Sequence, residues 1–188
     1  MKQIQKLYPI TEGEQPIERE FEVVEDLVGY VEKLKSAGVK VETAKKDCVV
    51  RAREVQVGET IDTRPRTIVD GKPYTFSETV RTVDESKAGF IAVTNPDGEE
   101  YMMSPEKFAS KYSANPDGTY QSVGGPQDFI RVSEDIIITP SNWGGATQTI
   151  TAGGLLNVSD MGDVYGITNA AFDATYKPVA PVEANVQG

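Results

Sequence analysis

The sequence contains no histidine and only one cysteine, and both facts narrow the chemistry that the protein can perform. Histidine is the side chain that most readily exchanges protons near neutral pH, and it is the commonest metal ligand. The single cysteine, Cys48, cannot form a disulfide within the chain, so the fold must be stabilised by packing or association. We therefore expect a protein that is not an enzyme and that carries no cofactor or metal.

Positive charge and long apolar runs are also scarce. The 188 residues include 19 lysines and arginines against 29 aspartates and glutamates, a formal net charge of −10. Such a chain would repel a phosphate backbone or an anionic membrane, so we expect neither nucleic acid nor membrane as a partner. Nowhere do roughly 18 apolar residues run together, and residues 1–13 have no apolar stretch of signal-peptide length. We expect synthesis in the cytoplasm without a signal peptide.

A repeat of 25 residues is the most informative feature that is present. Residues 88–112 align without a gap with residues 152–176, so that each residue matches the one 64 positions later. A duplicated unit in a chain of this length favours two small lobes over one large core. Identical residues occupy six matched pairs: Ala88 and Ala152, Gly89 and Gly153, Gly98 and Gly162, Tyr101 and Tyr165, Phe108 and Phe172, and Tyr112 and Tyr176.

Each copy predicts the same order of strand, turn, strand and short helix. The apolar stretches 90–93 and 155–158 predict the first strands, and turn-forming residues around the matched Gly98 separate each from a returning strand. Residues 104–106, Ser-Pro-Glu, are typical of a helix start. Phe and Tyr four residues apart then place both rings on one helix face, against the hairpin.

Upstream of the repeats, the pattern predicts one amphipathic helix and several short strands. Apolar residues recur at three- and four-residue steps over residues 23–36, and Gly38 suits the position just past the end of this helix. Asp70-Gly71 is typical of a tight hairpin, and residues 48–50 predict a strand in which Cys48 is a small apolar residue. The fold class is therefore α+β, mainly β, with two repeated β-rich lobes preceded by an amphipathic helix. The predicted regions are an N-terminal arm (1–22), the helix and its connection (23–46), the first lobe (47–117), the second lobe (118–176) and an extended tail (177–188).

The first lobe resembles a known family. The resemblance rests on Val50-Arg51-Ala52-Arg53, Ala88-Gly89, Gly98-Glu99-Glu100-Tyr101, and Phe108 to Tyr112. These residues resemble a small bacterial and phage domain family named for a Pro-Gly-Asp-Tyr-Gly motif, and residues 152–176 look like a second, degenerate copy. Ala88 and Ala152 stand where the proline of the motif would be, and its aspartate is missing. The resemblance implies a small β-rich module without an established chemistry.

Two chemical alternatives have simpler explanations. The acidic turns 95–100 and 159–163 offer several oxygens, as calcium requires, but they lack the EF-hand spacing, and hairpin turns favour the same residues. Cys48 could be a nucleophile, but no histidine is present to activate it. We interpret these segments as turns and a strand interior.

The residues that we expect to contact a partner lie in a turn and in the tail. Trp143, the only tryptophan, follows Asn142 between turn residues, a setting in which aromatic residues often anchor interfaces. The tail carries Lys177, Pro178 and Pro181 without any periodicity, and ends of this kind are usually ordered only by a partner.

These features predict a non-enzymatic structural protein that binds neighbouring subunits of a larger assembly. The assembly that we expect is a phage particle, in which the protein would be an accessory or decoration subunit of the capsid or tail. It would then be found in the virion after its synthesis in the host cytoplasm. The alternative is a soluble phage or bacterial binding module that recognises a small molecule or a host protein between its lobes.

Overall fold

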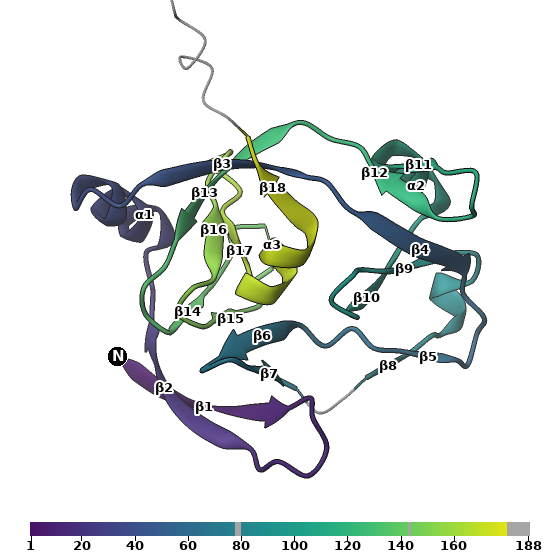
Figure 1. The fold of residues 1–188 in the computed structure, drawn as a ribbon. Coiled ribbons are helices and arrows are strands. Elements are labelled where there is room, and N and C mark those ends of the chain that lie inside the picture. The colour runs from purple at the N-terminus through teal and green to yellow at the C-terminus, as the bar shows by residue number, and fades with distance from the viewer. Residues whose placement is uncertain (78–79, 143, 180–188) are drawn as a thin grey trace, which may run out of the picture.

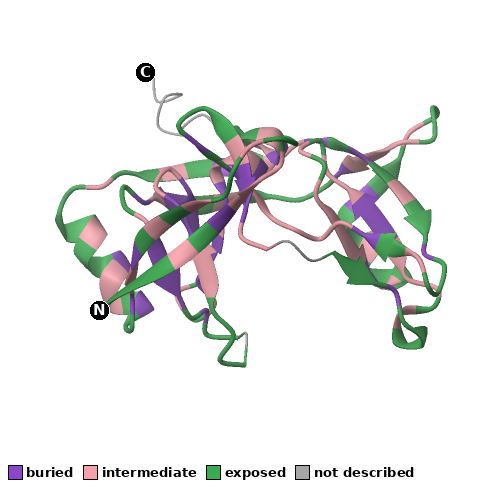
Figure 2. Cartoon of the chain, turned by 90° about the horizontal axis from the view of Figure 1, so that it is seen from below, coloured by how far each residue is buried: buried purple, intermediate pink, exposed green. Residues whose placement is uncertain are grey.

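The computed structural model describes residues 1–77, 80–142 and 144–179, and it confirms a mainly β fold of the α+β class. In this part of the chain, the strands form one six-stranded sheet, two five-stranded sheets and one two-stranded sheet (Figure 1). Figure 2 shows that the buried residues gather in two bodies joined by a narrow waist. The expected two-lobed organisation is therefore visible in the distribution of buried side chains.

The predicted repeat is confirmed element by element. The short helices begin and end 64 residues apart, and each is followed at once by a strand. Ser104 caps the first helix by accepting a hydrogen bond from the Lys107 N–H, and Thr168 caps the second in the same way from Ala171 (3.3 and 3.1 Å). The first copy comprises β9 (Ile91–Thr94), β10 (Glu100–Met103), α2 (Pro105–Lys111) and β11 (Tyr112–Ala114), and the second comprises β16 (Leu155–Asn157), β17 (Tyr165–Ile167), α3 (Asn169–Thr175) and β18 (Tyr176–Pro178).

A two-stranded antiparallel ribbon passes through both five-stranded sheets. One side of the ribbon is β3 (Val41–Lys46) followed by β4 (Val49–Glu54), and the other is β12 (Tyr120–Ser122) followed by β13 (Pro126–Arg131). The first lobe is the sheet β10-β9-β4-β12-β11 with α2, and the second lobe is the sheet β17-β16-β13-β3-β18 with α3. Each side of the ribbon therefore contributes one strand to each lobe.

This exchange changes the predicted lobe boundaries. Residues 118–176 do not form one lobe, because β12 pairs with β4 in the first lobe. The second lobe instead takes β3 from the segment that was expected to connect the helix to the first lobe. The alternation of side chains predicts a strand in each case, but it does not say which sheet the strand joins.

The predicted irregular arm over residues 1–22 is wrong, because this segment forms a hairpin. Its strands, β1 (Lys2–Pro9) and β2 (Ile17–Val23), pair in register from Lys2 with Glu22 to Leu7 with Ile17. Leu7 and Phe21 are fully buried, and they pack in one cluster with Ile137, which is far away in the sequence. Charged residues surround these few apolar positions, so the sequence alone does not show a strand pattern.

The hairpin belongs to the six-stranded sheet, whose strand order is β15-β14-β2-β1-β7-β6. Strands of this sheet pack against the second lobe. β14 pairs in parallel with β2, and β7 pairs in antiparallel with β1. The predicted turn at Asp70-Gly71 is confirmed between β6 and β7, where both residues have positive φ angles of 52° and 77°. The remaining elements are β6 (Arg66–Val69), β7 (Lys72–Thr75), β14 (Ile136–Ile138), β15 (Gln148–Ile150), the pair β5 (Thr60–Ile61) and β8 (Arg81–Thr82), and the short 3-10 helix η1 (Glu85–Lys87).

The amphipathic helix is confirmed as α1 (Leu27–Ser36), which starts four residues later than predicted. Asp26 ends the preceding extended segment and accepts a hydrogen bond from the Gly29 N–H at 3.0 Å, which fixes the start of the helix. Gly38 lies just past the last turn with a φ of 87°, as expected. Buried Leu27 and Val31 join α1 to the largest apolar cluster of the second lobe.

Candidate partner-binding surface

The outer face of the ribbon exposes apolar side chains near the waist of the molecule. Val49 on β4 and Val123 between β12 and β13 are 47% and 48% exposed, although their strand neighbours Cys48 and Ser122 are buried on the opposite face. Exposed apolar side chains that share one face of a sheet are typical of an interaction surface. We call this face, with the residues that line its hollow, the ribbon surface. It comprises Lys45, Asp47, Val49, Val123, Gly124, Pro126, Lys177 and Pro178.

A hollow of about 440 Å³ lies on the ribbon surface where β3 meets β18. Lys45 and Lys177 are paired across these two strands, so their ammonium groups stand on the same face. Lys177 is 3.7 Å from the carboxylate of Asp47, which also accepts a hydrogen bond from Gln121 at 3.0 Å. The hollow therefore combines two lysines with one carboxylate that is already engaged. Its lining residues are Lys45, Asp47, Gly124, Pro126, Lys177, Pro178 and Val179.

Beneath the ribbon, a lysine connects the two lobes. Lys46 belongs to β3 of the second lobe, but its ammonium group donates hydrogen bonds to the hydroxyls of Tyr101 and Tyr112 in the first lobe (3.1 and 2.9 Å). The same ammonium lies 5.4 Å from the centre of each tyrosine ring, within the range of a cation–π interaction. Burial raises the pKa of Tyr101, with Tyr112 adding to the effect. The cluster holds the waist together on the face opposite the exposed valines.

Two other titratable groups near the waist have shifted pKa values. Burial raises the pKa of the Cys48 thiol, which favours its neutral form and agrees with the predicted role as a small apolar residue. Burial also raises the pKa of Glu99 to about 7, and the neighbouring Asp97 carboxylate adds to the shift, while Arg66 and Lys46 oppose it. Glu99 therefore changes charge near neutral pH.

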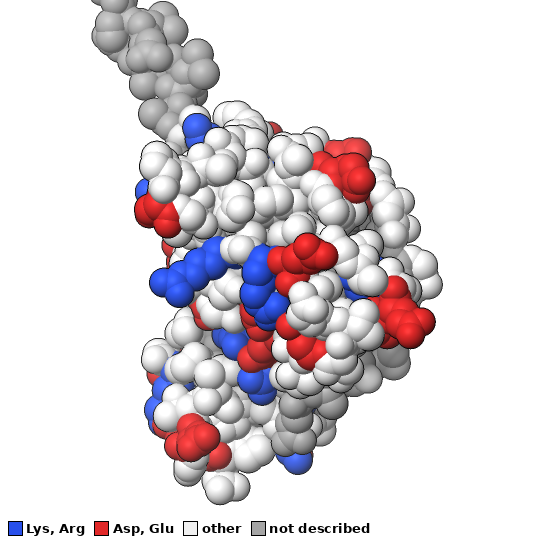
Figure 3. All heavy atoms as spheres, turned by 90° about the vertical axis from the view of Figure 1, so that its right-hand side faces the viewer, with Lys and Arg blue, Asp and Glu red and all other residues white. Residues whose placement is uncertain are grey.

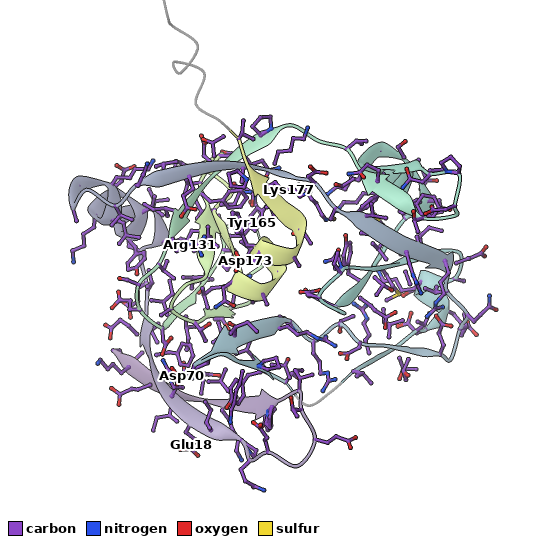
Figure 4. All side chains as sticks on the ribbon, in the orientation of Figure 1. Glu18, Asp70, Arg131, Tyr165, Asp173 and Lys177 are labelled. Atoms are coloured by element: carbon purple, nitrogen blue, oxygen red, sulfur yellow. The ribbon has the colours of Figure 1, made fainter. Side chains whose placement is uncertain are left out.

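The residues predicted to contact a partner fall into three groups. Lys177 and Pro178 lie on the ribbon surface, although they form β18 rather than a free tail. Asn142 is exposed in a turn, and the structure does not bring it together with the other two. Trp143 and Pro181 lie outside the described residues. Figure 4 shows Lys177 on β18, at the upper edge of the second lobe and above Tyr165 and Arg131 in that view.

Sequence reasoning missed Lys45, Val49 and Val123 as surface residues. A valine in a strand is normally interpreted as core, and alternation alone does not tell which face of the sheet another element covers. Lys46 was also missed, because the two tyrosines that it contacts are distant in sequence.

Within the described residues, no group of three or more acidic or cysteine side chains is arranged to hold a metal ion. In this part of the chain there is also no helix both long and apolar enough to cross a membrane. The acidic turn 95–99 is a hairpin turn in the structure, with Gly98 at a φ of 94° and Asp97 accepting a hydrogen bond from the Glu99 N–H.

Comparisons with known proteins give no match: no family model, no curated protein and no solved structure is similar to this chain. The resemblance of the repeats to the Pro-Gly-Asp-Tyr-Gly family therefore stays a prediction, and function must be argued from the surfaces of the molecule.

Proposed function

We propose that this protein is a non-catalytic structural subunit that binds a neighbouring protein of a larger assembly through the ribbon surface. The observation that carries the proposal is the pair of exposed valines on a sheet face whose reverse side is firmly packed. Removing one valine from water contributes roughly 1–2 kcal/mol to association. A surface that is already ordered loses little conformational entropy on binding, so more of that contribution is retained.

The assembly that we propose is a bacteriophage particle, with the protein as an accessory or decoration subunit on its capsid or tail. Support comes from the sequence resemblance to a phage and bacterial domain family and from the duplicated β-rich lobes. Two linked lobes can contact two neighbouring subunits at once, which raises avidity without any new kind of contact.

Charge and polarity changes on the ribbon surface test this proposal. Val123→Asp and Lys177→Glu alter exposed side chains and should each change the free energy of unfolding by no more than about 0.5 kcal/mol. We expect both variants to remain in the free fraction when native particles are separated by sedimentation. Val57→Asp is the matched control, because Val57 is 52% exposed but lies outside the ribbon surface. Incorporation of all three variants at the wild-type level would overturn the proposal.

A second candidate function is the binding of a small anionic molecule in the hollow beside β18. Its volume of about 440 Å³ falls within the roughly 300–1,000 Å³ range of ligand sites, and two lysines line it. Calorimetric titration with simple dicarboxylates and inorganic phosphate would show saturable binding that Lys45→Ala abolishes. An absence of heat with every such ligand would remove this candidate.

A further inference from the structure

The two lobes differ in what covers the outer face of their central strands. In the second lobe, Ile130 on β13 and Leu156 on β16 are fully buried in a cluster that contains residues of α1, β14 and β15, and Val158 is buried with them. The strand registers place Arg53, Ala92 and Thr94 at the matching positions of the first lobe. Ala92 is also buried, against Val55, Ile61 and Val83. In the described part of the chain, however, no α-helix packs on the end of this face that carries Arg51, Arg53 and Thr94.

A groove of about 480 Å³ occupies this open end of the face, and we call it the first-lobe groove. Arg51 and Arg53 stand on the same side of β4 as its principal charged groups. Arg53 pairs with Glu59, whereas Arg51 is exposed and makes no hydrogen bond or ion pair with any described residue. Figure 3 views this end of the molecule and shows Lys and Arg atoms near the middle of the face, with Asp and Glu around them. The groove is lined by Arg51, Ala52, Arg53, Ala92, Thr94, Asp117, Gly118 and Thr119.

The one carboxylate that lines the groove is already engaged. Asp117 accepts hydrogen bonds from both the N–H and the hydroxyl of Thr119, at 3.0 and 2.5 Å. These bonds lower the pKa of Asp117, so it stays ionised and bound to its own turn. The free guanidinium of Arg51 thus remains to pair with an acidic group from outside, a task for which its planar donors are suited.

The outer face of α1 offers the complementary chemistry. A second groove, of about 790 Å³, runs between α1, the end of β2 and Glu134, and five carboxylates and one lysine supply its charge. Glu25 and Glu32 are exposed and make no ion pair with any described residue. Val28, which is 42% exposed, lies four residues before Glu32 on the same face of α1, and Glu25 lies just ahead of the helix. The charged lining residues are Glu22, Glu25, Asp26, Glu32, Lys33 and Glu134.

These two surfaces lie at opposite ends of the molecule, with α1 at the left of Figure 1 and the first lobe at the right. They cannot meet within one copy. We propose that the acidic outer face of α1 docks in the first-lobe groove of a second copy, so that copies associate head to tail. Contacts of this kind join different patches and generate rings or filaments. The inference rests on the proposed function as an assembly subunit, and it names a second copy of the chain as one neighbour.

Paired charge reversals test the contact directly. We expect the mass of the wild-type protein in sedimentation velocity to rise with protein concentration and to fall with added salt, because exposed ion pairs are screened. Arg51→Glu and Glu32→Lys should each remain monomeric. An equimolar mixture of the two variants should associate again, since the reversed groove then faces the reversed helix while the unchanged surfaces still match.

The variants also separate specific pairing from general repulsion. Glu32→Lys reduces the large negative net charge, so a non-specific effect would increase association rather than abolish it. Arg81→Glu changes the net charge as Arg51→Glu does, at an exposed site outside both grooves, and should associate like the wild type. Circular dichroism checks that each variant is folded.

A wild-type protein that is monomeric at every concentration would overturn the inference. Variants that associate like the wild type, or a mixture that stays monomeric, would overturn it as well. A monomer that still enters native particles would contradict head-to-tail pairing and leave the proposed function intact. Failure of the proposed function would show instead as normal incorporation of the ribbon-surface variants.

Discussion

The first and second lobes have the same arrangement of elements but obtain their aromatic clusters from different strands. In the first lobe, Tyr120 on β12 packs edge-on against Phe108, which stacks on Tyr112. In the second lobe, Phe129 on β13 takes the equivalent place beside the stacked pair that follows it in sequence. The registers match Tyr120 with Ala44 and Phe129 with Ala52. Each lobe therefore has three rings and one alanine. The third ring comes from the β12–β13 side of the ribbon in both lobes, but from strands that do not occupy matching positions in the two sheets.

The lobes differ more in what surrounds them. The N-terminal hairpin, α1 and the β6–β7 hairpin all cover the second lobe, whereas the first lobe leaves open the end of one sheet face that carries Arg51, Arg53 and Thr94. The same repeated unit is thus enclosed by added elements in the second lobe and less so in the first.

Exchanging the character of the covered and open positions should have the largest effect. Ile130→Arg places a charge in the apolar cluster of α1, β14 and β15, where Ile130 is fully buried, and should destabilise the protein by about 4 kcal/mol or more. Arg53→Ile, the reverse change at the matching open position, should alter stability by less than about 1 kcal/mol, because it loses only an exposed ion pair. Urea unfolding of both variants measures the difference. Equal losses would contradict the assignment of one covered and one open face.

The third ring of the second lobe can be moved to the position that it occupies in the first lobe. Phe129→Ala should cost about 3–5 kcal/mol, because a buried ring leaves a cavity. Adding Ala44→Phe places a ring where the first lobe has Tyr120, and the double variant should recover part of the loss. The free energy of unfolding of the two single variants and the double variant gives the coupling. Losses that simply add would show that the two positions are not interchangeable.

The helix of the second lobe is attached to β6 by one side chain that the first lobe lacks. Asn169 accepts a hydrogen bond from the Ile68 N–H and donates one to the Ile68 carbonyl, both at 2.9 Å. Asn169→Ala should destabilise the protein by roughly 1–3 kcal/mol, because these backbone groups lose their partner. Thermal unfolding would show the loss. Pro105→Ala at the matching position is the control and should cost less than about 1 kcal/mol.

A smaller, pH-dependent effect is expected at Glu99. Its pKa of about 7 exceeds the ordinary value of 4.5, so the folded state holds the proton over a range in which the unfolded state has lost it. The contribution of Glu99 to stability therefore falls as the pH rises from 4.5 to about 7, and is constant above that. Glu99→Gln should flatten this slope and be more stable than the wild type at pH 8 by ~2 kcal/mol. Parallel stability curves for the two proteins would contradict the shift.

The sequence predicts local structure within the repeats well, because caps, turns and ring spacing act over a few residues. The starts of α2 and α3, the Asp70-Gly71 turn and the position of Gly38 all follow from such short-range signals. The N-terminal hairpin and the exchange of strands along the ribbon depend on partners far away in sequence. No local pattern specifies which sheet a strand joins.

The candidate site was predicted only in part for the same reason. Prolines and a lysine after the last helix suggested contacts by the tail, and Lys177 and Pro178 do lie on the ribbon surface. The exposure of Val49 and Val123 depends on the absence of a covering element, within the described residues, on that face of the waist. The first-lobe groove becomes apparent only when the registers of the two sheets are compared.

Hydrogen exchange on the full chain at low and high protein concentration tests most directly whether the first-lobe groove and α1 contact each other between copies. We expect slower exchange at high concentration in β4, in the turn around Gly118 and in α1, with unchanged exchange in the six-stranded sheet. Exchange that is independent of concentration in all three segments would show that copies do not pair through these surfaces.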